Sequence, residues 1–263
     1  MIELIKTELE KLPEADRRAV LREILQYIIL SILYKTDLGK QLGFMGGTSL
    51  HIFFQTKRFS EDLDFNLLGK LPYPFHELLE IVHKELTLLG LESEYTVNTN
   101  TNVYKSFIKF PSLIHGLGFV AHKDEKVQIK LEIDIKPPKL YVYETDLMQG
   151  YGQESYVQRA DLASMFAAKL YVCFHREYVK GRDFFDVLWF LQKNIVPYYP
   201  LMKELGLDIQ SKSQVVDYFT KGLKKIDFAL VKKDILPLLQ GGDGMSVPEK
   251  DVFLTVLERW GKL

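Results

Sequence analysis

The chain lacks the marks of a secreted or strongly charged protein. Cys173 is the only cysteine among 263 residues, and 34 Lys and Arg stand against 35 Asp and Glu, a formal net charge of −1. A lone cysteine excludes a disulfide scaffold and favours a cytoplasmic location. The balanced charge excludes a uniformly basic nucleic-acid-binding protein, but it is compatible with a local basic patch.

Long apolar runs and targeting signals are lacking as well. The most apolar stretch, residues 25–34, is too short to span a bilayer, which takes about 20 apolar residues. Residues 1–11 are polar and acidic and contain no apolar core of a signal peptide. We therefore expect no membrane partner.

Several common catalytic motifs are absent. The six histidines, at positions 51, 76, 83, 115, 122 and 175, form neither an HExxH motif nor a His/Cys pair at zinc spacing. P-loop, GxGxxG and GxSxG sequences are also missing. These absences argue against a zinc enzyme, a P-loop NTPase, a dinucleotide-binding enzyme and an α/β-hydrolase.

Hydrophobic periodicity predicts an α/β domain over residues 1–150 and a helical domain over residues 151–263. In the first domain we expect helices at 13–35, 48–55 and 74–89, with Thr48 as a helix cap and Gly90 as a C-cap. Strands are expected at 42–45, 62–68, 92–98, 103–110 and 126–135. In the second domain we expect helices at 160–176 and 183–193 and three or four more over 202–263, with residues 241–244 as a loop.

Gly46 and Gly47 stand between a predicted strand and a predicted helix. The backbone N–H groups at the start of such a helix form a site for phosphate. Glycine, which has no Cβ atom, also lets a ligand approach the backbone closely. A Gly-Gly pair alone is equally typical of a plain turn, so the interpretation depends on the neighbouring acids.

Asp62 and Asp64 are two residues apart on a predicted strand, so both side chains project to the same face. Leu63 and Phe65 then face a core. Two neighbouring carboxylates repel each other unless a cation neutralises them, and hard oxygen ligands suit Mg²⁺. An Asp-x-Asp pair by itself is also typical of a solvated strand edge.

The predicted strand at 126–135 supplies a third acid. Its apolar residues alternate with Lys130, Glu132 and Asp134, which share the other face. Either Glu132 or Asp134 could complete a three-carboxylate cluster that holds one or two Mg²⁺ ions. Such ions bind a triphosphate and lower the pKa of an attacking hydroxyl. Lys130 could meet phosphate charge from the same face.

The combined pattern resembles a known family. Gly-Gly-Thr-Ser-Leu at 46–50, Arg-Phe-Ser-Glu-Asp-Leu-Asp at 58–64 and Lys-Leu-Glu-Ile at 130–133 are similar to motifs of the AbiEii/AbiGii toxin family of nucleotidyltransferases. That family belongs to the polymerase-β-type superfamily, which is marked by Gly-Gly or Gly-Ser followed by Asp-x-Asp. Asp161, Lys169 and Arg182-Asp183-Phe-Phe-Asp186 resemble its later motifs, so the resemblance spans about residues 40–193.

The resemblance implies an α+β protein, with an N-terminal polymerase-β-type nucleotidyltransferase fold of mixed sheet and flanking helices and a helical C-terminal domain. It implies transfer of a nucleoside monophosphate from an NTP to a hydroxyl, with Mg²⁺ or Mn²⁺ as cofactor, and it favours Glu132 as the third acid. We assign catalysis to Asp62, Asp64, Glu132, Asp134, Lys130 and Lys169, metal binding to Asp62, Asp64 and Glu132, and nucleotide binding to Gly46, Gly47, Thr48, Arg58, Ser60, Asp183 and Asp186.

The resemblance also implies partners. It indicates the toxin of a toxin–antitoxin or phage-defence pair, with a cognate antitoxin and with RNA or tRNA as acceptor. Basic side chains that could contact such an acceptor are Arg176, Lys180, Arg182, Lys221, Lys224, Lys225, Lys232 and Lys233. Two alternatives stay open: a non-catalytic nucleotide-binding or interaction module of the same fold, and a nucleotidyltransferase that modifies a protein or a small molecule.

Overall fold

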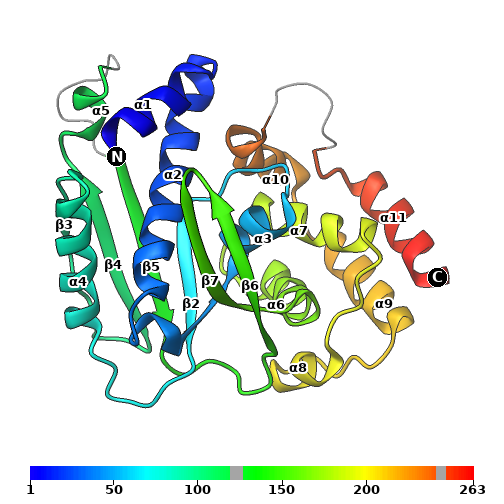
Figure 1. The fold of residues 1–263 in the computed structure, drawn as a ribbon. Helices are drawn as coiled ribbons and strands as arrows, with labels where there is room; N and C mark the ends of the chain where they lie inside the picture. The colour runs from blue at the N-terminus through cyan, green and yellow to red at the C-terminus, as the bar shows by residue number, and fades with distance from the viewer. Residues whose placement is uncertain (119–126, 241–246) are drawn as a thin grey trace. The chain divides into compact units, whose positions relative to one another are not determined.

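A seven-stranded mixed sheet organises the first of two units in the computed structural model, which describes residues 1–118, 127–240 and 247–263 (Figure 1). The strand order is β3-β4-β5-β2-β1-β7-β6. The strands are β1 (Leu42–Met45), β2 (Asp62–Leu67), β3 (Glu94–Tyr95), β4 (Val103–Phe110), β5 (Val127–Asp134), β6 (Tyr143–Gly150) and β7 (Gln153–Ala160). The α+β class predicted from the sequence is confirmed.

The centre of the sheet follows from the alternation of side chains. On β5, Val127, Ile129, Leu131 and Ile133 are fully buried, while the residues between them are not. Strand β2 pairs with β5 in parallel and with β1 in antiparallel orientation. Because neighbouring strands lie about 4.8 Å apart, residues in register on β2 and β5 hold their side chains side by side on one face.

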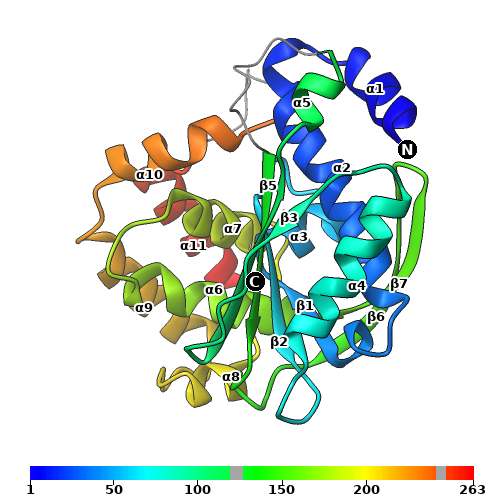
Figure 2. The same ribbon diagram turned by 90° about the vertical axis from the view of Figure 1, so that its left-hand side faces the viewer.

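Helix α2 (Glu14–Tyr34) packs against this sheet and against α4 (Phe75–Leu88), as Figure 2 shows. Every residue of α2 from 24 to 34 is buried, so this part of the helix is covered on all sides. The remaining helices of the unit are α1 (Ile2–Glu10), η1 (Gly39–Gln41), α3 (Gly46–Phe54) and α5 (Leu113–Gly116). No helix in the described part of the chain is long and apolar enough to cross a membrane.

Strands β6 and β7 were not predicted from the sequence. Met148 is the only buried residue of β6, so the strand has no clear apolar alternation. Strand β7 pairs with β1 in parallel, with Arg159 in register with Phe44. The first unit comprises Met1–Phe54, Phe59–Pro137 and Glu144–Arg159, which includes most of both strands. The domain limits 1–150 and 151–263 stay a prediction.

The second unit comprises Gln55–Arg58, Pro138–Tyr143 and Ala160–Leu263 and is mainly helical. Its core is aromatic: Phe166 and Phe190 stack at 4.8 Å between ring centroids, and Trp260 packs against Phe166. The helices are α6 (Leu162–His175), α7 (Gly181–Gln192), α8 (Tyr199–Glu204), α9 (Lys212–Leu223), α10 (Phe228–Ile235), η2 (Leu236–Leu238) and α11 (Lys250–Lys262). The predicted loop at 241–244 and position 126 of the predicted strand lie outside the described residues.

Candidate active site

The Gly-Gly turn joins β1 directly to α3 without an intervening loop. Gly46 has a φ angle of +81°, and a Cβ atom built there would lie 2.6 Å from Oδ2 of Asp64. Both the backbone conformation and the space therefore require glycine at this position. The close approach also shows that the Asp64 carboxylate lies against the first residue of α3.

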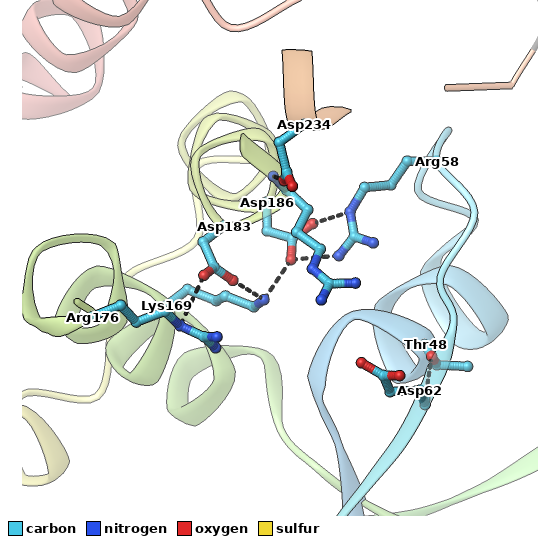
Figure 3. Close-up of polar contacts among 9 residues, drawn as sticks. Thr48, Arg58, Asp62, Lys169, Arg176, Asp183, Asp186 and Asp234 are labelled. Carbon is cyan, nitrogen blue, oxygen red and sulfur yellow. Dashed lines mark hydrogen bonds and ion pairs between the residues drawn. The ribbon is translucent and has the colours of Figure 1, made fainter. Parts of the chain in front are cut away.

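Thr48 does not cap the helix as predicted. Helix α3 begins at Gly46, so Thr48 falls inside its first turn. Its buried hydroxyl instead donates a hydrogen bond to the backbone carbonyl of Asp62, across to β2 (Figure 3). The physical reason is that Gly46 makes the strand-to-helix turn without a capping side chain, and the threonine ties the helix to the acidic strand.

The predicted faces of β2 are confirmed. Leu63 and Phe65 are buried in the core, whereas Asp62 and Asp64 are half-buried on the opposite face. On β5, the residues between the buried positions are Lys130, Glu132 and Asp134.

The strand register decides which acids are neighbours. Asp62 lies beside Lys130, Asp64 beside Glu132, and Asn66 beside Asp134. The register therefore favours Glu132 over Asp134 as the partner of the Asp-x-Asp pair. Asp134 uses Oδ1 to accept a hydrogen bond from the backbone N–H of Lys136, at 2.9 Å.

Two lysines hold the Glu132 carboxylate. Lys130 Nζ lies 2.7 Å from Oε2, and Lys105 Nζ on β4 lies 3.2 Å from Oε1. Lys105 was not predicted as a site residue, because its relevance depends on β4 pairing with β5 in a register that sets it opposite Glu132. Its position on the polar face of an alternating strand is the only sequence signal that could have indicated it.

These contacts favour the charged forms of Lys130 and Glu132. Burial alone would lower the pKa of Lys130, but the hydrogen bond and charge of Glu132, together with the charges of Asp62 and Asp64, raise it. Burial alone would raise the pKa of Glu132, but Lys130 and Lys105 lower it. One ammonium group is thus held within the field of three carboxylates.

The predicted convergence of three carboxylates on one point is not found. Among residues 1–118, 127–240 and 247–263, no three His, Cys, Asp or Glu side chains are arranged to hold a metal ion. The reason lies in the contacts of Glu132, whose two oxygens are each taken by a lysine. The donor chemistry nevertheless fits a hard cation, since Asp62, Asp64 and Glu132 offer carboxylate oxygens from adjacent strands on one face.

A second charged cluster lies wholly within the helical unit (Figure 3). Asp183 and Asp186 are three residues apart on α7 and so share one face of that helix. Lys169 Nζ on α6 lies 2.7 Å from Oδ1 of Asp183 and 2.8 Å from Oδ2 of Asp186. Arg176 Nε lies 3.1 Å from the other oxygen of Asp183.

Arg58 completes this cluster. Its guanidinium binds Asp186 in a bidentate manner, with Nε 2.7 Å from Oδ1 and Nη2 2.6 Å from Oδ2, and both side chains are fully buried. The predicted phosphate contact of Arg58 would therefore require this pair to open. Ser60 is also buried, and its carbonyl accepts a hydrogen bond from Gln26 Nε2 at 3.0 Å, which anchors the loop to α2.

Mutual attraction outweighs desolvation in the second cluster. Burial alone would lower the pKa of Lys169, but Asp183 and Asp186 raise it, with Arg58 acting in the opposite direction. Burial alone would raise the pKa of Asp183, but Lys169 and Arg176 lower it. Lys169 and Asp183 therefore stabilise each other's charged form, and their ion pair joins α6 to α7.

The family model described as "Nucleotidyl transferase AbiEii toxin, Type IV TA system" matches residues 28–221, which include both clusters. The chain belongs to the AbiEii nucleotidyltransferase toxin family. The family predicted from the sequence motifs is thus confirmed, and it supports a nucleotidyltransferase role.

Two solved structures from Helicobacter pylori share the fold of this chain. JHP933 is 19% identical, with a TM-score of 0.58, and the alignment covers 95% of this chain and 94% of that one. The second, described as a candidate nucleotidyltransferase, is 20% identical, with a TM-score of 0.59. Its alignment covers 95% of this chain and 96% of that one. At these identities the likeness shows the fold alone. No protein of curated function matches this chain.

Proposed function

We propose that this AbiEii-family chain transfers a nucleoside monophosphate from an NTP to an acceptor hydroxyl and releases pyrophosphate. The observation that carries the proposal is the register of β2 and β5, which sets Asp64 beside Glu132 with Asp62 on the same face. Gly46, which lies against Asp64, is the first residue of α3, so the N-terminus of this helix lies beside these acids.

Asp62, Asp64 and Glu132 would hold Mg²⁺ or Mn²⁺, because carboxylate oxygens are the ligands that these ions prefer. When bound, the ion would neutralise phosphate charge and lower the pKa of the attacking hydroxyl. A ligand role for Glu132 would weaken its two lysine contacts, because a metal ion at this carboxylate would repel their ammonium groups. Lys130 would then be released toward the phosphates.

The other groups act directly on the nucleotide. The N–H groups of Gly46 and Gly47 would bind the β- and γ-phosphates at the start of α3. The acceptor oxygen bonds to the α-phosphorus as the bond to the bridging oxygen breaks, and pyrophosphate leaves with that electron pair. The acceptor proton is lost to a base, for which this face offers the carboxylates of Asp62, Asp64 and Glu132. The positive charge of Lys130 would stabilise the departing pyrophosphate.

The cluster of Lys169, Asp183, Asp186 and Arg58 is proposed to support the site rather than to react. Two carboxylates already contact Lys169 Nζ, and Asp183, Asp186 and Arg58 are buried, so a phosphate would have to compete with these aspartates for Lys169. Nucleotide binding by Asp183 and Asp186 stays a prediction, and both carboxylates already contact Lys169.

RNA, in particular tRNA, is the proposed acceptor, and the chain is proposed to act in the cytoplasm as a toxin with a cognate antitoxin. The family description, which names a toxin–antitoxin system, supports the toxin role. The acceptor is proposed from the resemblance of the sequence motifs alone.

The test is incubation of the chain with each α-³²P-labelled NTP, total RNA and Mg²⁺, with EDTA as a control. Labelled RNA that disappears with EDTA and with Asp64→Asn, but persists with Asp134→Asn, would support the proposal. Label on protein would indicate a protein acceptor. No label with any NTP would leave a non-catalytic nucleotide-binding module.

A further inference from the structure

A cavity of about 440 Å³ lies within the helical unit, where α6 and α9 end. Its volume falls in the range of small-molecule pockets, roughly 300–1,000 Å³. Two segments line it, residues 173–179 and 218–226. None of the described residues that line it is among those assigned above to metal or NTP binding.

One part of the lining is aromatic. Phe174 and Tyr218 pack edge to face at 5.4 Å between ring centroids, and Tyr178 is 62% exposed at the rim. Cys173 adds a buried neutral group, because desolvation raises the pKa of its thiol. Planar rings of this kind are the platforms on which nucleobases stack.

Another part of the lining is cationic. Lys221 and Lys225 are exposed at the cavity, and neither has an ion-pair partner among residues 1–118, 127–240 and 247–263. Lys221 lies in the last turn of α9 and Lys225 just beyond the end of that helix, and because both line the same cavity their like charges repel. An anion between them would relieve this repulsion. Arg176, also in the lining, is already engaged with Asp183 at 3.1 Å, which joins the cavity to the Lys169 cluster.

Tyr218 provides a polar group inside the same cavity. Its hydroxyl is buried and has no hydrogen-bond partner in the part of the chain that the structure describes. A buried hydroxyl without a partner costs free energy, and a polar ligand that reached it would recover that cost. The cavity thus combines ring faces, two free ammonium groups and one unsatisfied hydroxyl.

We propose that this cavity binds one nucleotide unit, with its base against Tyr178 and Tyr218 and its phosphate at Lys221 and Lys225. Two sources share this chemistry: a nucleotide within a single RNA strand, and a free mononucleotide. Assigning the unit to the acceptor strand rests on the proposed function, whereas binding itself does not.

The experiment measures binding to the full chain without NTP or Mg²⁺, so that no transfer occurs. The probes are a fluorescent single-stranded oligoribonucleotide, followed by anisotropy, and the four nucleoside monophosphates as competitors. The cavity variants are Lys221→Ala with Lys225→Ala, and Tyr178→Ala. The matched control is Lys193→Ala with Lys203→Ala, which removes the same charge from exposed lysines outside the lining.

Loss of base stacking in Tyr178→Ala should weaken oligonucleotide binding about 5- to 150-fold. Loss of phosphate contacts in the double lysine variant should lower the salt slope of log K by about 0.7 per contact. All five side chains changed in these tests are exposed, so thermal melting should be near that of the unchanged chain. Competition by a mononucleotide would identify a free nucleotide as ligand, and binding of the strand alone would identify RNA.

Equal binding by the cavity and control variants would overturn the inference, as would binding of neither probe. Transfer assays distinguish failure of the cavity inference from failure of the proposed function. If the cavity variants alone lose binding while the unchanged chain transfers no label, the inference stands and the proposed function fails. If transfer proceeds and the variants keep RNA binding and KM, the function stands and the inference fails.

Discussion

Arg58 and Asp186 form a bidentate ion pair with no exposed surface, although 128 positions separate them in the sequence. Removing one partner leaves a buried charge without compensation, which costs about 3–5 kcal/mol. We therefore expect Asp186→Ala to lower the free energy of unfolding by about that amount, measured by urea denaturation. Glu258→Ala, which breaks an exposed pair with Lys262, should change stability far less. Equal effects of the two variants would contradict this assignment.

Gly46→Ala should reduce both stability and transfer. An alanine at a φ of +81° costs roughly 1–2 kcal/mol, and its Cβ would also displace the Asp64 carboxylate. Gly90→Ala is the matched control, because Gly90 has a φ of +77° and an added Cβ there meets nothing within 4 Å. Comparable unfolding free energies but a selective loss of label transfer in Gly46→Ala would locate the effect at Asp64. Equal transfer by both variants would refute it.

The register predicts which acid on β5 is required. Glu132→Gln should lower transfer by more than about 100-fold, because even groups behind a metal ligand typically contribute 10–100-fold. Asp134→Asn, beside Asn66 rather than an aspartate, should retain transfer close to that of the unchanged chain. Initial rates with labelled NTP provide the measurement. The opposite ranking would show that Asp134 is the third acid.

Lys105 should oppose metal binding, because its ammonium occupies one oxygen of Glu132. Lys105→Met is expected to tighten Mg²⁺ binding several-fold in calorimetric titration without NTP, since one competing cation is removed. Lys109→Met is a suitable control, because Lys109 lies opposite Gln128 on the same strand pair. Unchanged or weaker Mg²⁺ binding in Lys105→Met would argue against Glu132 as a ligand.

The pair of Lys169 and Asp183 predicts a pH dependence of stability. The pKa of Asp183 is lowered from 3.8 by Lys169 and Arg176 against the effect of burial, so its contribution is present above pH 3.8 and is lost as the pH falls through the lower folded-state value. The pKa of Lys169 is raised from 10.5, so its contribution is present below pH 10.5 and is lost as the pH rises further. Asp183→Asn should therefore be much less stable than the unchanged chain at pH 7, with the gap narrowing below pH 3.8. Chemical denaturation at several pH values measures this difference in unfolding free energy. A difference that stays constant below pH 3.8 would contradict the pairing.

The sequence by itself determined the local features of this protein. Alternation along residues 62–68 and 126–135 placed the acids on one face of each strand, since the side-chain period of a strand is 2. The motifs around Gly46, Asp62 and Glu132 identified the family, and helical periodicity located most of the helices. These features depend on neighbours within a few residues, so they can be predicted without knowing the tertiary contacts.

Only the tertiary structure decided which of these residues meet. The parallel register of β2 and β5 set Asp64 beside Glu132, and the pairing of β4 brought Lys105 to the same carboxylate. The fold likewise brings Arg58 to Asp186 on α7. Strand β7, with little alternation to indicate it, formed through its pairing with β1. Strand order and register depend on long-range packing, and a shift of one residue would turn every side chain to the opposite face.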